Sequence, residues 1–243
     1  MKFSIVTATH NSGARIEKTV RSVRAQEGVE LEHLIVDNAS TDDTLERIER
    51  CQSPCVRVVS EPDTGIYNAF NKGLARASGG AIAFLNADDF YLPGALARVA
   101  ARFASLPGAA VVHGNIEVDS PRGPRAVRPR AGWSSFGGAR VFHPATFMRR
   151  EVFERVGSFD ERYRIAADLD LFLRARERCA FAHLDKTLTH FALGGVSTER
   201  RFRTTAEVVA ILRRHGFPLS TVLRTALSEN LWNVLALLAG PFR

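Results

Sequence analysis

Residues 3–36 read FSIVTATHNSGARIEKTVRSVRAQEGVELEHLIV, and this stretch decides the fold. Its two ends, residues 3–8 and 31–36, are apolar runs typical of buried β-strands. Between them, Ile16, Val20 and Val23 recur on one face of a helix, and Gly28 provides a stop after that helix. Strand, helix and strand in this order predict a βαβ unit with two parallel strands.

The same alternation continues outward through the first half of the chain. Further strands are predicted at residues 56–59, 81–85 and 111–118, and helices at 69–77 and 93–104. Another helix carries Leu45 and Ile48, and the side chain of Ser40 or Thr41 can cap its first turn. Pro93 suits the first turn of the later helix. We therefore expect an α/β fold with a mostly parallel sheet flanked by helices.

The regular pattern breaks at residues 121–129, which are rich in proline and glycine. Four arginines accompany this break: Arg122, Arg125, Arg128 and Arg130. Such a composition predicts a mobile basic loop between two halves of the chain. Beyond it we expect a short strand from Thr146, helices at 152–156 and 168–178, a β-like stretch at 181–191, and helical patterns to the end.

Size, charge and cysteine content restrict the class of protein. With 243 residues, of which 45% are hydrophobic, the chain can bury the core of one large domain, with or without an appendage. Its net charge of +7 favours anionic partners such as phosphates, nucleic acid or acidic lipid. Three cysteines and a start without a signal peptide predict a reducing cytoplasm. No run reaches the roughly 18 apolar residues of a membrane-spanning helix.

Polar residues stand where the predicted strands end. The first strand ends in Ala8-Thr9-His10, the second in Asp37, and the strand over 81–85 is followed by Asn86-Ala87-Asp88-Asp89. Because ligands bind at the carboxyl ends of strands in open α/β sheets, these three regions are predicted to meet at one ligand. Asp37 is suited to hydrogen-bond a base or ribose, and equally to cap the next helix or close the loop.

The paired carboxylates Asp88 and Asp89 follow a run that we expect to be a buried strand. Leaving both unpaired there would be costly, and a cation would offset that cost. Carboxylates together with phosphate oxygens and water are the ligands that Mg²⁺ or Mn²⁺ prefers beside a diphosphate. The alternative is that one aspartate caps the helix that follows.

Four stretches, VTATHN, LIVDNASTDDT, EPDTGIYNAFNKGLARASG and AFLNADD, together resemble the sugar-donor half of the family 2 glycosyltransferases. The resemblance extends over roughly residues 1–200. It implies a GT-A (Rossmann-like) fold, a nucleotide-diphosphate-sugar site and a divalent metal, Mn²⁺ or Mg²⁺. It further implies that Asp88 holds the metal and that the nucleotide sugar is bound by Ala8, Thr9, His10, Asp37, Asp63, Lys72, Asn86 and Ala87. Asn86 departs from the family's Asp-x-Asp signature, and an amide in that place predicts weaker metal binding.

Residues 143–174, HPATFMRREVFERVGSFDERYRIAADLDLFLR, resemble the acceptor half of the same enzymes, and most of all bacterial polysaccharide-building members. Asp168 matches the position of the family's catalytic base, although an aspartate there also suits a helix N-cap. Asp170 is two residues away and points to another face of the helix, where it would orient or cap that helix. His143, Asp89 and Asp170 are further candidates for contact with the acceptor or diphosphate. His190, together with Gly194 and Gly195, is a candidate for closing over the sugar donor.

The resemblance implies three parts of the chain. Residues 1–115 form the half that binds the nucleotide sugar, residues 116–200 the acceptor-binding and catalytic half of the same GT-A domain, and residues 201–243 a C-terminal helical extension. The implied reaction is transfer of the sugar, with inversion, to a hydroxyl of a saccharide or lipid-linked saccharide. The segment 219–242 either packs on the main domain or lies on the anionic inner face of the plasma membrane.

Two other functions compete with this one. The basic charge fits a nucleic-acid-binding module, but the arginine-rich loop lacks aromatic residues that would stack on bases, so nucleic acid is not an expected partner. A noncatalytic role in binding nucleotide sugars would account for Asn86. Against it, the chain retains Asp88 for the metal and Asp168 for the base. A Rossmann dehydrogenase is disfavoured because HNSGAR, rather than G-x-G-x-x-G, follows the first strand.

Overall fold

The structure is a computed structural model, and it describes residues 1–51, 53–120, 123–129, 141–192, 201–225 and 227. Several of the sequence features above lie outside these ranges: Arg122, Arg130, Gly194, Gly195 and the end of the chain from residue 228.

The predicted βαβ unit opens the fold. Strand β1 (Lys2–Thr9) leads into helix α1 (Gly13–Arg24), which returns the chain to strand β2 (Glu30–Asp37). The two strands pair in parallel from Lys2 opposite Glu30 to Thr9 opposite Asp37. Their carboxyl ends therefore lie side by side, as the sequence predicted.

Nine strands among the described residues form one sheet, in the order β3-β2-β1-β4-β8-β6-β9-β5, with β7 paired to β6. Strands β3 (Val56–Ser60), β2, β1 and β4 (Ala81–Asn86) are parallel. Strand β8 (Thr146–Arg149) is antiparallel to both β4 and β6 (Val111–Val118), and β9 (Phe181–Phe191) is parallel to β6. The parallel arrangement predicted thus holds in the first half, and the second half is mixed.

Two short strands were not predicted. Strand β5 (Phe90–Tyr91) pairs with β9, and β7 (Arg125–Val127) pairs with β6 inside the segment expected to be a loop throughout. Two or three residues are too few for an alternating pattern, so only pairing with a neighbour reveals such strands.

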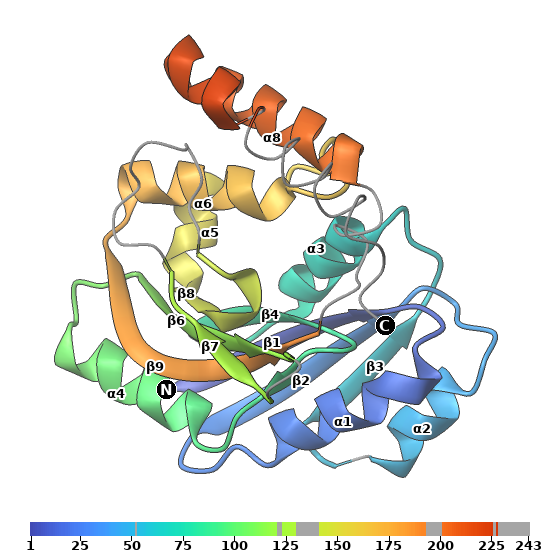
Figure 1. Cartoon of the computed structure of the whole chain (residues 1–243). Coiled ribbons are helices and arrows are strands. Elements are labelled where there is room, and N and C mark those ends of the chain that lie inside the picture. The colour runs from blue at the N-terminus through green and yellow to red at the C-terminus, as the bar shows by residue number, and fades with distance from the viewer. Residues whose placement is uncertain (52, 121–122, 130–140, 193–200, 226, 228–243) are drawn as a thin grey trace.

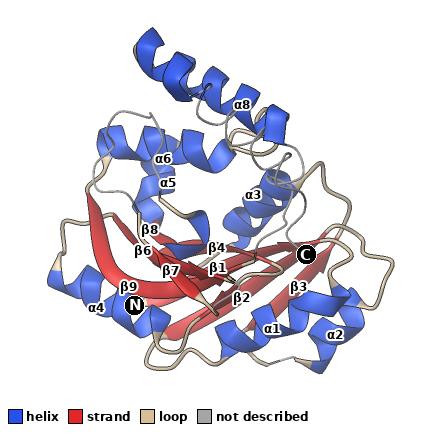
Figure 2. Ribbon diagram, viewed as in Figure 1, coloured by secondary structure: helices blue, strands red, loops and turns tan. Residues whose placement is uncertain are grey.

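Helices cover both faces of the sheet (Figures 1 and 2). One face packs against α1 and α4 (Ala95–Ser105), and α2 (Thr44–Arg50) packs beside α1. The other face packs against α3 (Ile66–Arg76), α5 (Arg150–Val156) and α6 (Ala167–Arg178). Strand β1 serves both layers, because Ile5 joins the core on the α4 side and Val6 the core on the α3 side.

Helix α3 lies very close to the sheet. A Cβ added at Gly73 would stand 2.2 Å from a methyl group of Val6, so only glycine permits this approach. Helix α3 begins at Ile66, a turn earlier than predicted. Its early start brings Tyr67 into the helix, next to the residues of the candidate site.

Two helix starts differ from the prediction. Helix α2 begins at Thr44 with Asp43 at the N-cap position, so neither Ser40 nor Thr41 caps it. Ser40 instead donates hydrogen bonds to Asp37, three residues before it. Helix α4 begins at Ala95 after Gly94, so Pro93 lies outside its first turn.

The chain after residue 200 forms an additional layer on α6 (Figure 1). Helix α8 (Arg201–Arg214) packs Ile211 and Leu212 against Ala166 and Leu173, and Val222 of a following helical segment, 219–225, completes this cluster. The prediction that this part packs on the main domain is confirmed for these residues. No helix within the described ranges is long and apolar enough to cross a membrane.

Candidate functional site

The loops after β1 and β2 meet at the edge where the predicted ligand site lies. His10 Nδ1 is 2.9 Å from the carbonyl oxygen of Asn38, and the backbone N–H of Asn11 donates to Ser40 Oγ at 2.8 Å. Asn11 and Ala39 have φ angles of 48° and 46°, in the left-handed region that costs energy for residues with a side chain. The strand order reverses between β1 and β4, so these loops stand at a topological switch point, where α/β sheets bind ligands.

Asp37 lies at this edge but is fully buried. Its carboxylate accepts hydrogen bonds from the backbone N–H of Ser40 at 2.9 Å, from Ser40 Oγ at 2.5 Å and from Ser60 Oγ at 2.7 Å. Of the two roles that the sequence left open, this geometry favours closing the loop over direct contact with a base.

Asp63 reaches the same loops from the segment before α3. Its backbone N–H donates to Asn38 Oδ1 at 2.7 Å, and its carboxylate accepts from the N–H of Gly65 at 2.7 Å. Burial raises the pKa of Asp63, and the charges of Lys72 and His10 act against that rise. Lys72 itself donates to the carbonyl oxygen of Pro62 at 2.7 Å and pairs with Glu61 at 3.0 Å. The structure therefore brings Asp63, His10 and Asn38 together, with Lys72 behind them.

Asp89 does not face a ligand, contrary to the prediction of a contact with the diphosphate or acceptor. Its side chain is fully buried, and it accepts hydrogen bonds from the N–H of Ala192 at 2.9 Å and from Asn86 Nδ2 at 3.1 Å. Burial raises its pKa to about 8. Asp89 thus ties the loop after β4 to the end of β9. Ala87 is also buried, and its carbonyl oxygen accepts from Thr19 Oγ1 at 2.9 Å.

Asp88 points the other way, with 21% of its side chain exposed and Arg15 at 3.3 Å. The neighbouring Asn86 Oδ1 is buried and has no hydrogen-bond partner in the part of the chain that the structure describes. A buried oxygen without a partner is costly unless a ligand supplies one. Among the described residues, no three or more His, Cys, Asp or Glu side chains gather to hold a metal by themselves. One carboxylate and one amide oxygen nevertheless fit Mg²⁺ or Mn²⁺, which take their other ligands from phosphate and water.

Asp168 lies in the first turn of α6, where Ala166 occupies the N-cap position, so the alternative role as N-cap is wrong. Its Oδ2 is 3.7 Å from His143 Nδ1, and its Oδ1 is 3.1 Å from the hydroxyl of Tyr67. The same hydroxyl is 2.8 Å from the carbonyl oxygen of Ile165. With 28% of its side chain exposed, Asp168 is held by neighbours yet open to a substrate.

His143 connects Asp168 to the β4 edge. Burial lowers its pKa, while the negative charges of Asp168 and Asp88 act to raise it. The ring nitrogen Nε2 is buried and has no hydrogen-bond partner among the described residues. His143 therefore links the candidate base to β4, because its own turn, His143–Ala145, packs against that strand.

Asp170 is fully buried, and its partners lie on α6 and beyond the end of α8. It pairs with Arg174 Nε at 2.8 Å and with His215 Nε2 at 3.0 Å. Asp168 and Asp170 thus have different surroundings, as their spacing predicted, and the burial of Asp170 contradicts the suggested contact with acceptor or diphosphate. Its carboxylate orients α6 against the chain after α8.

His190 packs at the far end of β9. Its ring stacks on Phe90 with 4.4 Å between centroids, and its Nδ1 lies 3.2 Å from Glu117. The glycines with which it was expected to close over the sugar donor lie outside the described residues.

Sequence reasoning missed two residues of this region, Tyr67 and Glu207. Tyr67 stands three residues before Phe70, a spacing that reads as ordinary helix core, and both side chains are indeed buried. Glu207 contacts the segment before Asp168 from a helix 40 residues further along the chain. Neither contact leaves a local pattern in the sequence.

Comparison with known proteins places this geometry in a family. The family model described as Glycosyl transferase family 2 matches residues 4–158. An uncharacterized glycosyltransferase of Mycobacterium tuberculosis is 31% identical over 220 residues, which cover 88% of this chain and 82% of the relative. A PGL/p-HBAD biosynthesis glycosyltransferase of Mycobacterium bovis is 32% identical over 187 residues, covering 71% of this chain and 68% of that protein.

Two solved structures share the fold. A mannosyltransferase from Pyrobaculum calidifontis, in complex with GDP-Man and Mn²⁺, aligns with a TM-score of 0.71 at 19% identity and covers 96% of this chain and 75% of its own. TarS from S. aureus aligns with a TM-score of 0.69 at 22% identity over 86% of this chain, which spans 39% of the TarS chain. The fold is therefore GT-A, and the chain is an enzyme that belongs to glycosyl transferase family 2.

Proposed function

We propose that the enzyme transfers a sugar from a nucleotide-diphosphate sugar to an acceptor hydroxyl, with inversion, and that Asp168 is the catalytic base. One observation carries the assignment: Asp168 is a partly exposed carboxylate that lies 3.7 Å from His143 and accepts a hydrogen bond from Tyr67 at 3.1 Å. Residues 1–115 would bind the sugar donor, residues 116–200 the acceptor, and residues 201–243 would form a helical extension.

The sugar donor would lie against the loops at the ends of β1, β2 and β4. Ala8, Thr9 and His10 would border the base, with Asp63 beside them and Asp37 and Lys72 supporting the loops from behind. The solved relatives support a donor of this class, since one holds GDP-Man and the TarS fragment 1–349 holds UDP-GlcNAc.

Asp88, with Asn86 beside it, would hold Mn²⁺ or Mg²⁺. When bound, a divalent cation neutralises charge on the departing diphosphate. Among the described residues, Arg15 pairs with Asp88 at 3.3 Å and places a cation at this position. The Mn²⁺ in the mannosyltransferase supports this assignment.

The chemical step follows from the placement of Asp168. Its carboxylate removes the proton of the acceptor hydroxyl while that oxygen forms a bond to the anomeric carbon. The bond from that carbon to the diphosphate breaks, and its electron pair leaves with the nucleoside diphosphate. Attack from the face opposite the leaving group inverts the anomeric configuration. Tyr67 holds one oxygen of Asp168 and thereby orients the other.

We further propose a saccharide or lipid-linked saccharide acceptor and a location in the cytoplasm, at the inner face of the plasma membrane. The mycobacterial relative named for PGL/p-HBAD biosynthesis supports a glycolipid or polysaccharide product. Three exposed leucines, Leu219, Leu223 and Leu227, recur every four residues and so form one apolar face suited to the membrane surface.

A panel of UDP-, GDP- and dTDP-sugars with Mn²⁺ or Mg²⁺ tests this function. We expect one nucleotide class to raise the melting temperature in a metal-dependent way. Transfer from that sugar donor to saccharide acceptors should give a product of opposite anomeric configuration by NMR. Retention of configuration would exclude the single displacement. Binding without turnover across acceptors would favour the noncatalytic alternative, and salt-dependent binding of random oligonucleotides the nucleic-acid one.

A further inference from the structure

The turn just before the helix that carries Asp168 is held by a residue from another helix. Helix α6 begins with Ala166 at its N-cap, and the methyl group of an alanine cannot accept hydrogen bonds from the first-turn N–H groups. Arg164, Ile165 and Ala166 present backbone N–H groups just before this helix. They point to one side chain, Glu207 of α8.

Glu207 accepts three hydrogen bonds from these groups. Oε1 lies 3.1 Å from the nitrogen of Arg164, and Oε2 lies 2.8 Å from that of Ile165 and 3.1 Å from that of Ala166. Only 13% of the side chain is exposed. Bonds to an ionised acceptor are stronger than neutral ones, and a negative charge at a helix N-terminus is further favoured by the helix dipole.

The backbone that Glu207 holds is in contact with the candidate base. The carbonyl oxygen of Ile165 is 2.8 Å from the hydroxyl of Tyr67, which is 3.1 Å from Asp168. The N–H of Ile165 donates to Glu207, and its carbonyl oxygen accepts from Tyr67, so the backbone of this residue is held on both sides. Asp168 follows only three residues later.

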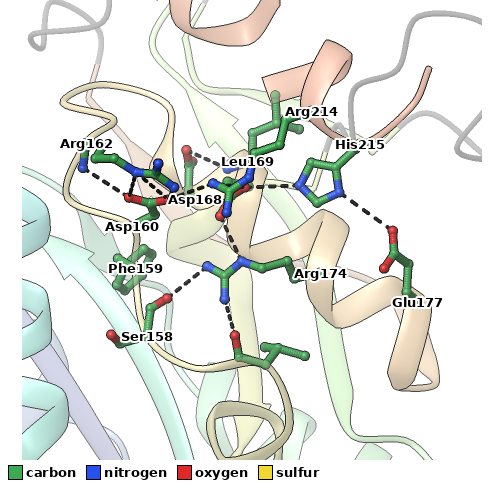
Figure 3. Close-up of polar contacts among 12 residues, drawn as sticks. Ser158, Phe159, Asp160, Arg162, Asp168, Leu169, Arg174, Glu177, Arg214 and His215 are labelled. Atoms are coloured by element: carbon green, nitrogen blue, oxygen red, sulfur yellow. Dashed lines mark hydrogen bonds and ion pairs between the residues drawn. The ribbon is translucent and has the colours of Figure 1, made fainter. Parts of the chain in front are cut away.

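Two other contacts fix α8 itself to this region (Figure 3). Arg214 at the end of α8 pairs with Asp160 at 2.7 Å, and His215 pairs with the buried Asp170 at 3.0 Å. Ile211 and Leu212 add apolar packing against α6. Helix α8 is thus a rigid support from which Glu207 reaches the turn before Asp168.

We propose that Glu207 is a positioning residue for sugar transfer: it holds the turn 164–166, and with it Tyr67 and Asp168, in the orientation that the reaction needs. The proposal rests on the proposed function, in which Asp168 is the base. It makes α8 a necessary part of the acceptor half, although the family model ends at residue 158.

Glu207→Gln and Glu207→Ala test the proposal, with Glu177→Gln as control. Glu177 is 64% exposed and contacts His215 at the same α6–α8 interface, without touching residues 164–166. Glutamine keeps one acceptor oxygen, but its NH2 group cannot accept a hydrogen bond. The kcat of Glu207→Gln should therefore lie between those of wild type and Glu207→Ala. We expect kcat to fall about 10- to 100-fold in Glu207→Ala, the range expected from a misplacement of about 1 Å. The KM for the sugar donor and the Kd for free UDP or GDP should stay unchanged.

Backbone hydrogen exchange without substrate is the second measurement. Glu207→Gln should speed exchange of the amides of residues 164–166, and Glu177→Gln should not. Unchanged exchange overturns the proposal whatever the enzyme transfers. Faster exchange with unchanged kcat also overturns it, because Glu207 would then stabilise the turn without serving the reaction. If Glu207→Gln exchanges faster but the wild-type protein transfers no sugar, then Glu207 does hold the turn 164–166. In that case only the proposed function fails.

Discussion

Asp168 is a carboxylate beside His143 that is held by Tyr67 and is open to solvent. Asp168→Asn preserves size and the hydrogen bond from Tyr67 but cannot accept a proton. We expect kcat to fall by about 10² to 10⁴, the usual contribution of a general base, with UDP or GDP binding unchanged by calorimetry. Asp119→Asn is the control, because that carboxylate is 77% exposed and pairs with His190 at 3.5 Å. Transfer at the wild-type rate would remove Asp168 from the mechanism.

We expect residue 86 to set how tightly the proposed metal binds. Asn86→Asp restores the Asp-x-Asp pattern but places a second carboxylate against Asp89, which now accepts a hydrogen bond from Asn86 at 3.1 Å. Burial already raises the pKa of Asp89 to about 8, and a second buried carboxylate beside it is costly to ionise, so we expect a lower melting temperature in EDTA. Mn²⁺ should raise the melting temperature of Asn86→Asp by more than that of wild type, because tighter binding stabilises the folded state more. Asn86→Ala should lose the Mn²⁺ effect, and an equal Mn²⁺ shift in all three proteins would place the metal elsewhere.

At the scale of single residues, the sequence distinguishes candidate functional residues from structural ones only in part. It singled out Asp88 and Asp168, which the fold leaves partly exposed, but also Asp89 and Asp170, which the fold buries. Adjacent aspartates look alike in a sequence, and the difference comes from Ala192 and His215, which lie far along the chain. Only tertiary contacts could have told them apart.

Strands β1, β2 and β4 are tied together at their start by one buried carboxylate, Glu32. It accepts hydrogen bonds from Ser4 Oγ at 2.5 Å, from Ser78 Oγ at 2.8 Å and from the N–H of Gly79 at 3.2 Å. Burial opposes its ionisation, yet the hydrogen bonds from Ser4 and Ser78 outweigh burial and lower the pKa of Glu32 from 4.5 to about 2. The tie lies at the opposite end of the strands from the candidate site, so it bears on stability.

Because this pKa is lower in the folded state, the stabilisation is complete above pH 4.5 and is lost as the pH falls through 2. We expect Glu32→Gln to lower the free energy of unfolding by about 3 kcal/mol at pH 7, as measured with urea. The difference from wild type should shrink as the pH falls below 4.5. Glu30→Gln, on the same strand and with 71% of its side chain exposed, should change little. A difference that stays constant down to pH 2 would show that the charge of Glu32 is not the cause.

The elements with long apolar patterns were predicted, and those defined by partners were not. Strands β1, β2 and β4 and helix α6 follow from periodicity, because each buries a regular face. Strand β5 exists through its pairing with β9, and the start of α2 depends on Ser40 turning to Asp37. A local sequence pattern does not reveal such pairings.

The molecule as a whole is a sheet between two helical layers, with α8 added on the layer that bears Asp168 (Figure 1). The sequence predicted a helical extension after residue 200. Its contacts to the turn before Asp168 join groups over 40 residues apart, such as the side chain of Glu207 and the backbone N–H of Ile165. The extension is consequently better described as a support of the acceptor half than as an appendage.

The segment after α8 presents two faces with different partners. Val222 is buried against Ile211 and Leu212, whereas Leu219, Leu223 and Leu227 are 64%, 53% and 70% exposed. A spacing of four residues places these leucines on one side of a helix, and an apolar stripe of this kind favours a surface that excludes water. The net charge of +7 adds attraction to anionic lipid.

We therefore expect the full chain to sediment with vesicles that contain phosphatidylglycerol, and less with neutral vesicles. Replacing all three leucines by serine removes roughly 1 kcal/mol of insertion free energy each, so partitioning should weaken about 100-fold. Their exposure means that the free energy of unfolding should change by less than about 0.5 kcal/mol per site. Leu106→Ser, 39% exposed at the end of α4, serves as control and should bind vesicles as wild type does. Equal sedimentation of the triple variant and wild type would show that this face does not meet the membrane.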